Sequence, residues 1–251
     1  MNKIFFGSDK IVKIKELIPI KTQRFLKILF PPFCVSCQRL NYYLCPSCYQ
    51  KIEFLKQQYC AYCGQPSLEG LTHYHCRRRY GLDRCQSAVF YRGPIRPLIK
   101  KFKYHQARVL LPLIKNLFQR YFTDPELLIP AQKTLIIPIP LHPRRLKERS
   151  FNQAQLLAEI AEELWNLPSV ADLLIKTKDT PSQTQLSGKE RRHNLQNAFA
   201  INPARQHLLK QYSTFLLIDD VITTGTTLIS AARVLKRKGA PRVEAITLAH
   251  D

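Results

Sequence analysis

The chain is predicted to be an α/β protein in which a parallel sheet, with helices on both faces, follows a small metal-binding region. After residue 87, short apolar runs alternate with segments of helical periodicity, which is the pattern of βαβ units. Before that point, all eight cysteines fall between Cys34 and Cys85, in a region too short to fold without bound metal. We therefore expect three parts: a basic leader (1–32), a double metal-binding region (33–87) and an α/β domain (88–251).

The leader is basic, and so is the chain as a whole. The chain has 39 Lys and Arg against 18 Asp and Glu, a net charge of +21. Such an excess favours polyanions or phosphorylated ligands, although part of it can be solvated surface. The leader lacks the continuous apolar run of a secretion signal, and no run of 18 apolar residues predicts a membrane span. We expect a cytoplasmic protein, with the inner face of the membrane as the alternative location.

The first four cysteines are spaced as ligands of one metal ion. They form two CxxC pairs separated by seven residues: Cys34, Cys37, Cys45 and Cys48. Two such pairs on short turns direct four thiolates at a tetrahedral Zn²⁺, and without an export signal disulfides are disfavoured. We expect a closed, structural zinc site.

A second zinc site is expected just downstream, with a less regular pattern. Cys60 and Cys63 form a clear pair, but a returning CxxC would end at position 79, which is an arginine. Read backward, His73 and Cys76 have the spacing of a pair. The preferred ligands are therefore Cys60, Cys63, His73 and Cys76. The competing ligands are His75 and Cys85, and a metal-free site with reactive thiols is the other interpretation.

The elements of the α/β domain follow from where apolar residues recur. Compact apolar runs predict strands, and prolines close the run at 134–139. Apolar residues at intervals of three and four predict helices, as across 152–164. The expected strands are 88–91, 134–139, 173–176, 198–201, 215–219 and 243–249, and the expected helices are 95–104, 109–122, 152–164, 189–196 and 227–237.

The strongest functional signal is the junction between the strand at 215–219 and the helix that follows it. The apolar run ends in Asp219 and Asp220, and a threonine-rich loop leads into the helix. Unpaired N–H groups at a helix start attract anions, hydroxyls add donors, and glycine lets the backbone approach closely. The residues expected to bind phosphate are Thr223, Thr224, Gly225, Thr226 and Thr227.

The two carboxylates cannot bind that phosphate, because like charges repel. Asp219 and Asp220 are expected instead to accept hydrogen bonds from neighbouring sugar hydroxyls, or to help hold a divalent cation. A sugar phosphate is therefore the expected ligand. An ordinary strand-to-helix turn is the weaker interpretation, because it leaves the acidic pair without a role. Neither a Walker A nor a Rossmann glycine pattern is present.

Other segments can complete such a site. Arg144 and Arg145 follow the strand at 134–139, and arginine forks suit the oxygens of a diphosphate leaving group. Lys103 lies between aromatic residues at a helix end, where it can contact phosphate or extend along the surface. The polar segment 176–191 has the composition of a lid, although a plain surface loop fits it equally well.

These residues match known families as a set. The stretch 216–227 resembles the signature with which type I phosphoribosyltransferases bind phosphoribosyl pyrophosphate (PRPP). Together with the CxxC pairs, Pro138-x-Pro140 and Arg149–Gln153, it makes the chain similar to the ComF family, in which a double zinc region precedes a phosphoribosyltransferase-like domain. The similarity covers about residues 26–250. It departs at Arg79, where many relatives would carry a cysteine.

The resemblance implies a parallel-sheet, type I phosphoribosyltransferase-like domain that binds PRPP with Mg²⁺, behind a region that holds two structural zinc ions. Asp219 and Asp220 would act at the reacting sugar. The phosphate ligands would be the loop 223–227, Arg144, Arg145, Lys103 and Arg191. The resemblance also implies natural competence, the uptake of single-stranded DNA into the cytoplasm. Single-stranded DNA and membrane-associated DNA-uptake proteins would then be partners.

Two other functions stay open at this point. One is a base-salvage phosphoribosyltransferase, and the other is a non-enzymatic, zinc-dependent nucleic-acid adaptor. The acidic pair and its loop favour a transferase, whereas the zinc pairs and the positive charge favour a nucleic-acid protein. No residue is recognisable as a base for an acceptor, so the acceptor is not predicted. A purine-pathway amidotransferase is disfavoured, because its glutaminase half needs an N-terminal nucleophilic cysteine and this chain begins Met1-Asn2.

Overall fold

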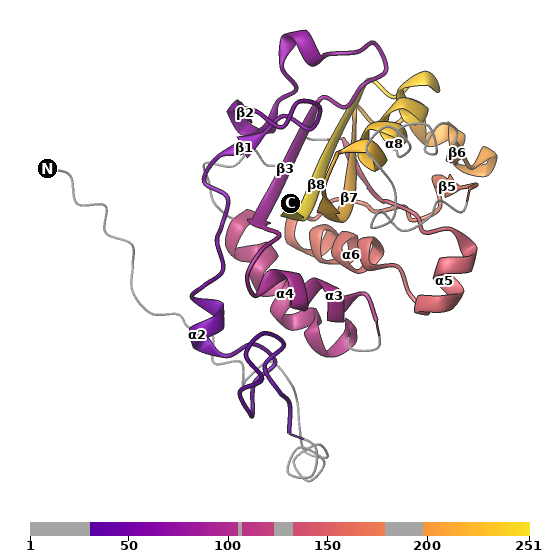
Figure 1. Cartoon of the computed structure of the whole chain (residues 1–251). Helices are drawn as coiled ribbons and strands as arrows, with labels where there is room; N and C mark the ends of the chain where they lie inside the picture. The colour runs from indigo at the N-terminus through magenta and orange to yellow at the C-terminus, as the bar shows by residue number, and fades with distance from the viewer. Residues whose placement is uncertain (1–30, 105–106, 123–132, 179–197) are drawn as a thin grey trace, which may run out of the picture.

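The computed structural model describes residues 31–104, 107–122, 133–178 and 198–251, and at their centre is a four-stranded parallel sheet (Figure 1). All three pairs of neighbouring strands are parallel. The predicted fold class is therefore confirmed. In spatial order the strands are β3 (Arg84–Phe90), β8 (Arg242–His250), β7 (Thr214–Ile222) and β4 (Thr134–Pro138).

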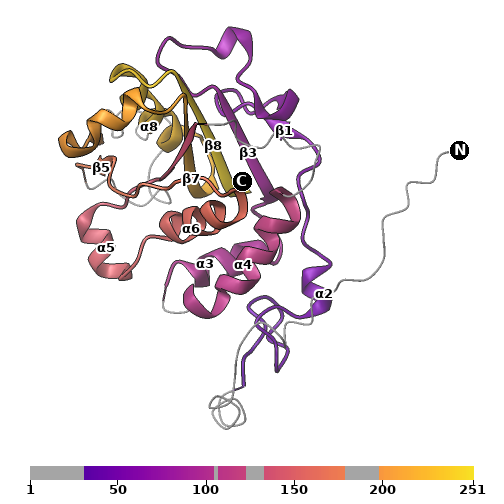
Figure 2. The ribbon, with the colours of Figure 1, turned by 180° about the vertical axis from the view of Figure 1, so that it is seen from behind.

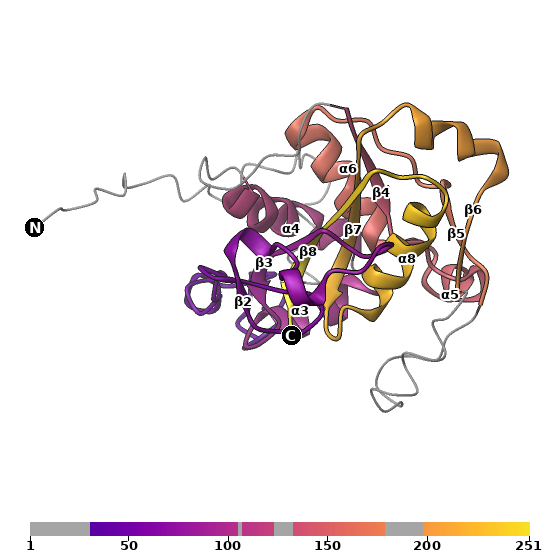
Figure 3. The same cartoon turned by 90° about the horizontal axis from the view of Figure 1, so that it is seen from above.

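Helices cover both faces of this sheet, because consecutive strand residues are apolar and point to opposite sides. Leu216 packs in the core of one face and Leu217 in the core of the other. In Figure 3, α4 and α6 lie on one side of the sheet and α8 on the other. The first face carries α3 (Ile95–Phe102), α4 (Ala107–Phe122) and α6 (Gln153–Trp165). The second carries α8 (Thr226–Arg237) and an antiparallel pair, β5 (Leu174–Lys176) and β6 (Phe199–Ile201).

Two elements of the α/β domain were not predicted, α5 (Pro143–Arg149) and the 3₁₀ segment η3 (Pro203–Lys210). The helix α5 buries no residue, so its sequence carries no apolar periodicity. It starts at a proline, and the His142 side chain accepts a hydrogen bond from the Arg144 N–H at 3.4 Å. Local capping thus sets a helix that packing does not reveal.

Three strands are longer than predicted, β8 by one residue at each end. The strand β7 continues past the acidic pair because its pairing with β8 extends to Ile222 and His250. The strand β3 starts at Arg84, so the expected boundary between residues 87 and 88 falls inside a strand. The helix expected at 189–196 and most of the leader lie outside the described residues.

The cysteine-rich region packs on the α/β domain at two separate places (Figures 1 and 2). Near its start, the Tyr49 hydroxyl donates to the Asn116 side chain on α4 at 2.9 Å. Further on, the Gln58 side chain donates to the Ser87 carbonyl at 3.0 Å and accepts from the Ser87 N–H at 2.9 Å. The elements of this region are α2 (Pro46–Tyr49), β1 (Gln58–Tyr59), β2 (Pro66–Ser67), η1 (Leu68–Gly70) and η2 (Tyr74–Cys76).

None of the helices in the described part of the chain combines the length and the apolar character that crossing a membrane requires.

Replacing Gln58 with leucine should destabilise the fold. The strand β3 is at the sheet edge, so the buried Gln58 amide satisfies backbone groups of Ser87 that no neighbouring strand reaches. Leaving them unpaired costs about 1–3 kcal/mol, measured by urea unfolding. As the control, Gln155→Leu alters an exposed glutamine on α6 and should change the free energy of unfolding by less than about 0.5 kcal/mol. Equal effects of the two variants would contradict this account.

Candidate functional site

The loop between β7 and α8 is held in a tight conformation by a glycine. Gly225 has a φ of +68°, in the left-handed region that favours glycine. A Cβ atom at this position would also lie 2.4 Å from the carbonyl oxygen of Ala61, which belongs to the second cysteine cluster. The glycine is therefore required by a neighbouring backbone segment as well as by the turn, a contact that the sequence did not predict.

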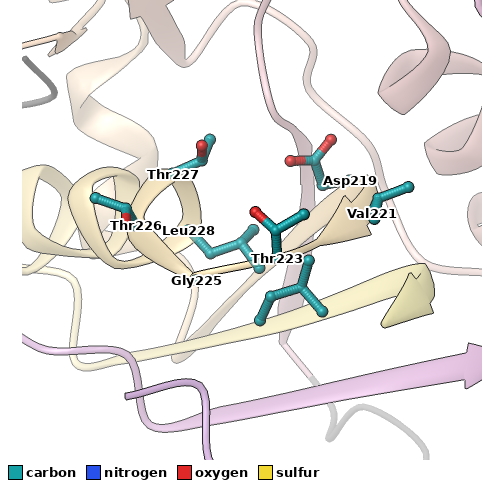
Figure 4. Close-up of a pocket in the computed structure, with 8 residues that line it drawn as sticks. Asp219, Val221, Thr223, Gly225, Thr226, Thr227 and Leu228 are labelled. Atoms are coloured by element: carbon teal, nitrogen blue, oxygen red, sulfur yellow. The ribbon is translucent and has the colours of Figure 1, made fainter. Parts of the chain in front are cut away.

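A small pocket opens between this loop and the start of α8 (Figure 4). Asp219 and the hydroxyl-bearing Thr223 and Thr227 lie on the same side of the loop in that view. Thr224 does not line the pocket; its hydroxyl lies 2.7 Å from that of Thr226. The pocket combines the carboxylate with the N-terminus of a twelve-residue helix. The lining residues are Asp219, Val221, Ile222, Thr223, Gly225, Thr226, Thr227 and Leu228.

The two carboxylates of the acidic pair have different surroundings. Asp219 accepts a hydrogen bond from the Asp220 N–H at 2.8 Å and faces the pocket. Desolvation by burial and the negative charge of Asp220 raise the pKa of Asp219 to about 7. The side chain of Asp220 is instead paired with the ammonium group of Lys103, at 2.8 Å. One carboxylate is thus directed at the ligand space and the other is neutralised by a fixed cation.

Lys103 is brought to the acidic pair by residues from α5 and α6. It caps the C-terminus of α3, and its carbonyl accepts a hydrogen bond from the Gln153 side chain at 3.0 Å. Arg149 in turn donates to the Gln153 side chain at 3.2 Å. Burial disfavours the Lys103 ammonium, but the charge of Asp220 outweighs it and raises the pKa of Lys103 above its ordinary value.

Gln153 and Arg149 were not predicted to support the site. Both belong to the segment Arg149–Gln153 that contributed to the family resemblance, but the sequence assigned them no role. Gln153 is only 2% exposed, so its amide has to find partners inside the protein. A glutamine at the start of an amphipathic helix carries no sequence signal that distinguishes this buried role from an ordinary exposed one.

The remaining predicted phosphate ligands are three arginines, Arg144, Arg145 and Arg191. Arg144 and Arg145 are on α5, which follows the carboxyl end of β4, and Asp219 and Asp220 lie near the same end of the neighbouring β7. Arg144 forms an ion pair with Glu148 at 3.6 Å. Arg191 and most of the predicted lid at 176–191 lie outside the described residues.

The cysteines form two groups that fit a tetrahedral metal ion. Within each group, the ligand atoms all lie within 4.8 Å of one another. In a zinc–thiolate tetrahedron with bonds of about 2.3 Å, ligand atoms are about 3.8 Å apart, so only a small contraction is needed. The groups are Cys34, Cys37, Cys45 and Cys48, and Cys60, Cys63, His73 and Cys76.

In the second group the geometry favours His73 over its competitors. The Nδ1 atom of His73 lies 3.3 Å from the Cys63 sulfur, and Nε2 lies 3.1 Å from the Pro66 carbonyl oxygen. Because a carbonyl only accepts, Nε2 carries the proton and Nδ1 is left for a metal. The His75 ring stacks on that of His73. Cys85 is buried in the core beside α8, and burial raises the pKa of its thiol to about 12.

Comparisons with known proteins match both halves of the chain. A Double zinc ribbon domain matches residues 25–77, and a Phosphoribosyl transferase domain matches residues 154–251. Competence protein F of Haemophilus influenzae is 30% identical over 220 residues, which are 82% of this chain and 90% of that protein. DNA utilization protein YhgH of Escherichia coli K12 is 30% identical over 195 residues (74% and 81%). Competence protein ComFC of Bacillus subtilis is 28% identical over 213 residues (82% and 83%).

Replacing His73 with alanine should remove one zinc ion per chain. The variant keeps three thiolates in the second group but loses the imidazole that completes the tetrahedron. Zinc content measured by native mass spectrometry should fall from two ions to one. The matched control is His75→Ala, which removes the neighbouring imidazole and should retain both ions. Loss of zinc from the control alone would reverse the assignment.

Replacing Asp219 with asparagine should stabilise the protein at high pH. The pKa of an ordinary aspartate is 3.8, and burial raises the pKa of Asp219 to about 7 in the folded protein. The folded state therefore loses stability relative to the unfolded chain as pH rises from the first value to the second. Asparagine mimics the protonated form. Its gain in melting temperature should therefore grow from pH 4 to pH 7 and then level off, as measured by calorimetry.

The control for this pH series is Asp172→Asn, which alters an exposed carboxylate paired with Arg205. It should show no gain that grows with pH. A constant difference between Asp219→Asn and the unmodified protein across this range would show that Asp219 ionises normally.

Proposed function

This chain belongs to the ComF family of competence proteins, and from that membership we propose that it binds PRPP or a closely related sugar phosphate in the pocket between β7 and α8. One observation carries the proposal: the Asp219 carboxylate and the N-terminus of α8 line the same pocket. The first suits sugar hydroxyls and the second suits a phosphate. The match of residues 154–251 to a phosphoribosyl transferase domain supports the same ligand class.

The proposed pose follows from the charges. The 5′-phosphate would lie against Thr223, Thr226 and Thr227, where the start of α8 directs its first backbone N–H groups. Asp219 would accept hydrogen bonds from the ribose hydroxyls. The phosphate would serve as a fixed handle whose binding energy orients the sugar.

The diphosphate of PRPP would need positive charge at the other end of the sugar. Lys103 is already in the site, paired with Asp220, and arginines of α5 follow the adjacent strand. The carboxylate that faces the pocket is that of Asp219, and it would suit a hydrated Mg²⁺ accompanying the diphosphate. Bound Mg²⁺ would neutralise charge on the departing pyrophosphate. If the protein transfers the phosphoribosyl group, the acidic pair would also favour the positive charge that develops at the sugar.

We place this binding activity within the handling of DNA during natural competence. The relatives are named for competence and for DNA utilization, and their similarity covers most of the chain. The net charge of +21 suits a protein that meets single-stranded DNA. We propose a cytoplasmic site of action, with membrane-associated uptake proteins as partners. A base-salvage transferase accounts for neither the zinc ribbons nor the charge.

Replacing Asp219 and Asp220 together with asparagine should weaken PRPP binding at least a hundredfold. The change removes the carboxylates that would hold the sugar hydroxyls while keeping their size. Isothermal titration calorimetry with PRPP and Mg²⁺ measures the affinity, and circular dichroism checks that the variant is folded. The control, Asp172→Asn with Glu53→Gln, removes two exposed carboxylates elsewhere, which pair with Arg205 and Arg92, and should bind normally. Unchanged affinity in the acidic-pair variant would refute the proposed site.

A further inference from the structure

The pocket between the β7–α8 loop and the start of α8 is called the phosphate pocket below. A second and larger hollow lies directly beside it. We call it the outer groove; it runs between the second cysteine group and α8 and encloses about 590 Å³. Three of its residues, Ile222, Thr223 and Thr226, also line the phosphate pocket. An anion held by the loop therefore has the outer groove on its far side. The full lining is Cys60, Ala61, Tyr62, Gly64, Arg78, Ile222, Thr223, Thr224, Thr226, Ile229, Ser230, Arg233 and His250.

The chemistry of the outer groove suits phosphate groups. Two exposed residues contribute guanidinium groups, Arg78 from one wall and Arg233 from α8. The Arg78 guanidinium also donates to the His75 and Arg77 carbonyls, at 3.2 and 2.9 Å. Thr226, Ser230 and Arg233 are spaced by four and three residues, so they share one face of α8. None of the described residues that line the groove is acidic. Two forked cations and several hydroxyls in one groove favour a ligand with more than one phosphate.

The two walls are held in a fixed relation by the protein backbone. The Ala61 carbonyl lies against Gly225, and the hydroxyls of the flanking Thr224 and Thr226 lie 2.7 Å from each other. The Tyr62 hydroxyl accepts a hydrogen bond from the Leu82 N–H at 2.8 Å and anchors the cysteine-rich wall. The groove is thus part of the folded structure rather than a gap between two independent units.

We propose that this arrangement binds the 3′ end of a single-stranded nucleic acid, with the phosphate of the terminal nucleotide in the phosphate pocket and the preceding nucleotide in the outer groove. The inference rests on the proposed function, because it uses the same loop and acidic pair. The 5′-phosphate of PRPP is a monoester and needs only the loop. The outer groove offers a route for a second ester on that phosphate, which only a polynucleotide or a similar phosphodiester has.

The acidic pair determines which end of the strand is accepted. The sugar in the pocket must present a free hydroxyl to Asp219. In an internal nucleotide the 3′ oxygen is esterified, and its phosphate would lie against Asp219 and Asp220, where like charges repel. Only the last nucleotide at the 3′ end has both a 5′-phosphodiester and a free 3′-hydroxyl. A volume of about 590 Å³ suits roughly one further nucleotide rather than a long strand.

The test compares two decathymidylate probes that carry a fluorophore at the 5′ end and differ only at the 3′ end. One ends in a hydroxyl and the other in a phosphate, and binding is measured by fluorescence anisotropy at several salt concentrations. The hydroxyl probe should bind at least tenfold more tightly. PRPP with Mg²⁺ should displace it, because both ligands need the loop.

A charge-matched pair of double variants tests the outer groove. Arg78→Ala with Arg233→Ala should weaken binding of the hydroxyl probe at least tenfold. It should also lower the salt slope by about 1.4, because each of the two neutralised phosphates contributes about 0.7. Its affinity for PRPP should stay within twofold. The control, Lys115→Ala with Arg205→Ala, removes two cations that pair with Glu163 and Asp172 instead. Its affinity for the probe should change less than threefold.

Equal binding of the two probes, or equal losses in the two double variants, would overturn the inference and leave PRPP binding untouched. Absence of any oligonucleotide binding would overturn it as well. If the protein distinguishes the two probes but does not bind PRPP, the 3′-end recognition stands and the PRPP proposal fails. The two proposals are therefore separable in one set of measurements.

Discussion

Two like charges at the end of a buried strand must be compensated, and the site is built around that requirement. Asp219 and Asp220 extend from an inner strand of the parallel sheet, whose two faces are covered by helices. The cation that compensates them, Lys103, comes from the end of a helix much earlier in the chain. The side chain of Gln153, at the start of α6, donates a hydrogen bond to the Lys103 carbonyl and holds it in place. A carboxylate pair of this kind therefore requires the complete domain, and the loop alone would not create the pocket.

The sequence predicted those features that local chemistry determines. Apolar runs located the four sheet strands, and the acidic pair with its threonines identified the phosphate loop, because each signal lies within a short run of consecutive residues. The contact between Lys103 and Asp220 could not be predicted in the same way, since it depends on how α3 packs against the sheet. The helix α5 was missed because a helix with no buried residue has no apolar pattern. Arg191 was predicted from the family resemblance alone, and it lies outside the described residues.

The two cysteine groups relate differently to the α/β domain. The first packs on α4 through its own apolar residues and Tyr49. The second is joined to the edge of the sheet through Gln58 and lies directly against the phosphate loop. Spacing along the chain limited the ligand candidates of the second group, but His73 and His75 are only two residues apart. The contact of the His73 ring with the Cys63 sulfur separates them, and it forms in the folded structure at the start of the 3₁₀ turn Tyr74–Cys76.

Gly225 is constrained both by the conformation of its own loop and by a neighbouring backbone segment. In a loop that binds phosphate, a glycine is usually explained by the ligand, which must approach the backbone closely. Here the same residue also lies under the carbonyl of Ala61, where no side chain fits. Grafting this loop onto a transferase scaffold that lacks the ribbon would relieve one of these two demands. Conversely, a redesigned cysteine-rich region must keep the backbone at Ala61 in place. A shifted Ala61 carbonyl would displace the phosphate loop although none of the loop's own residues has changed.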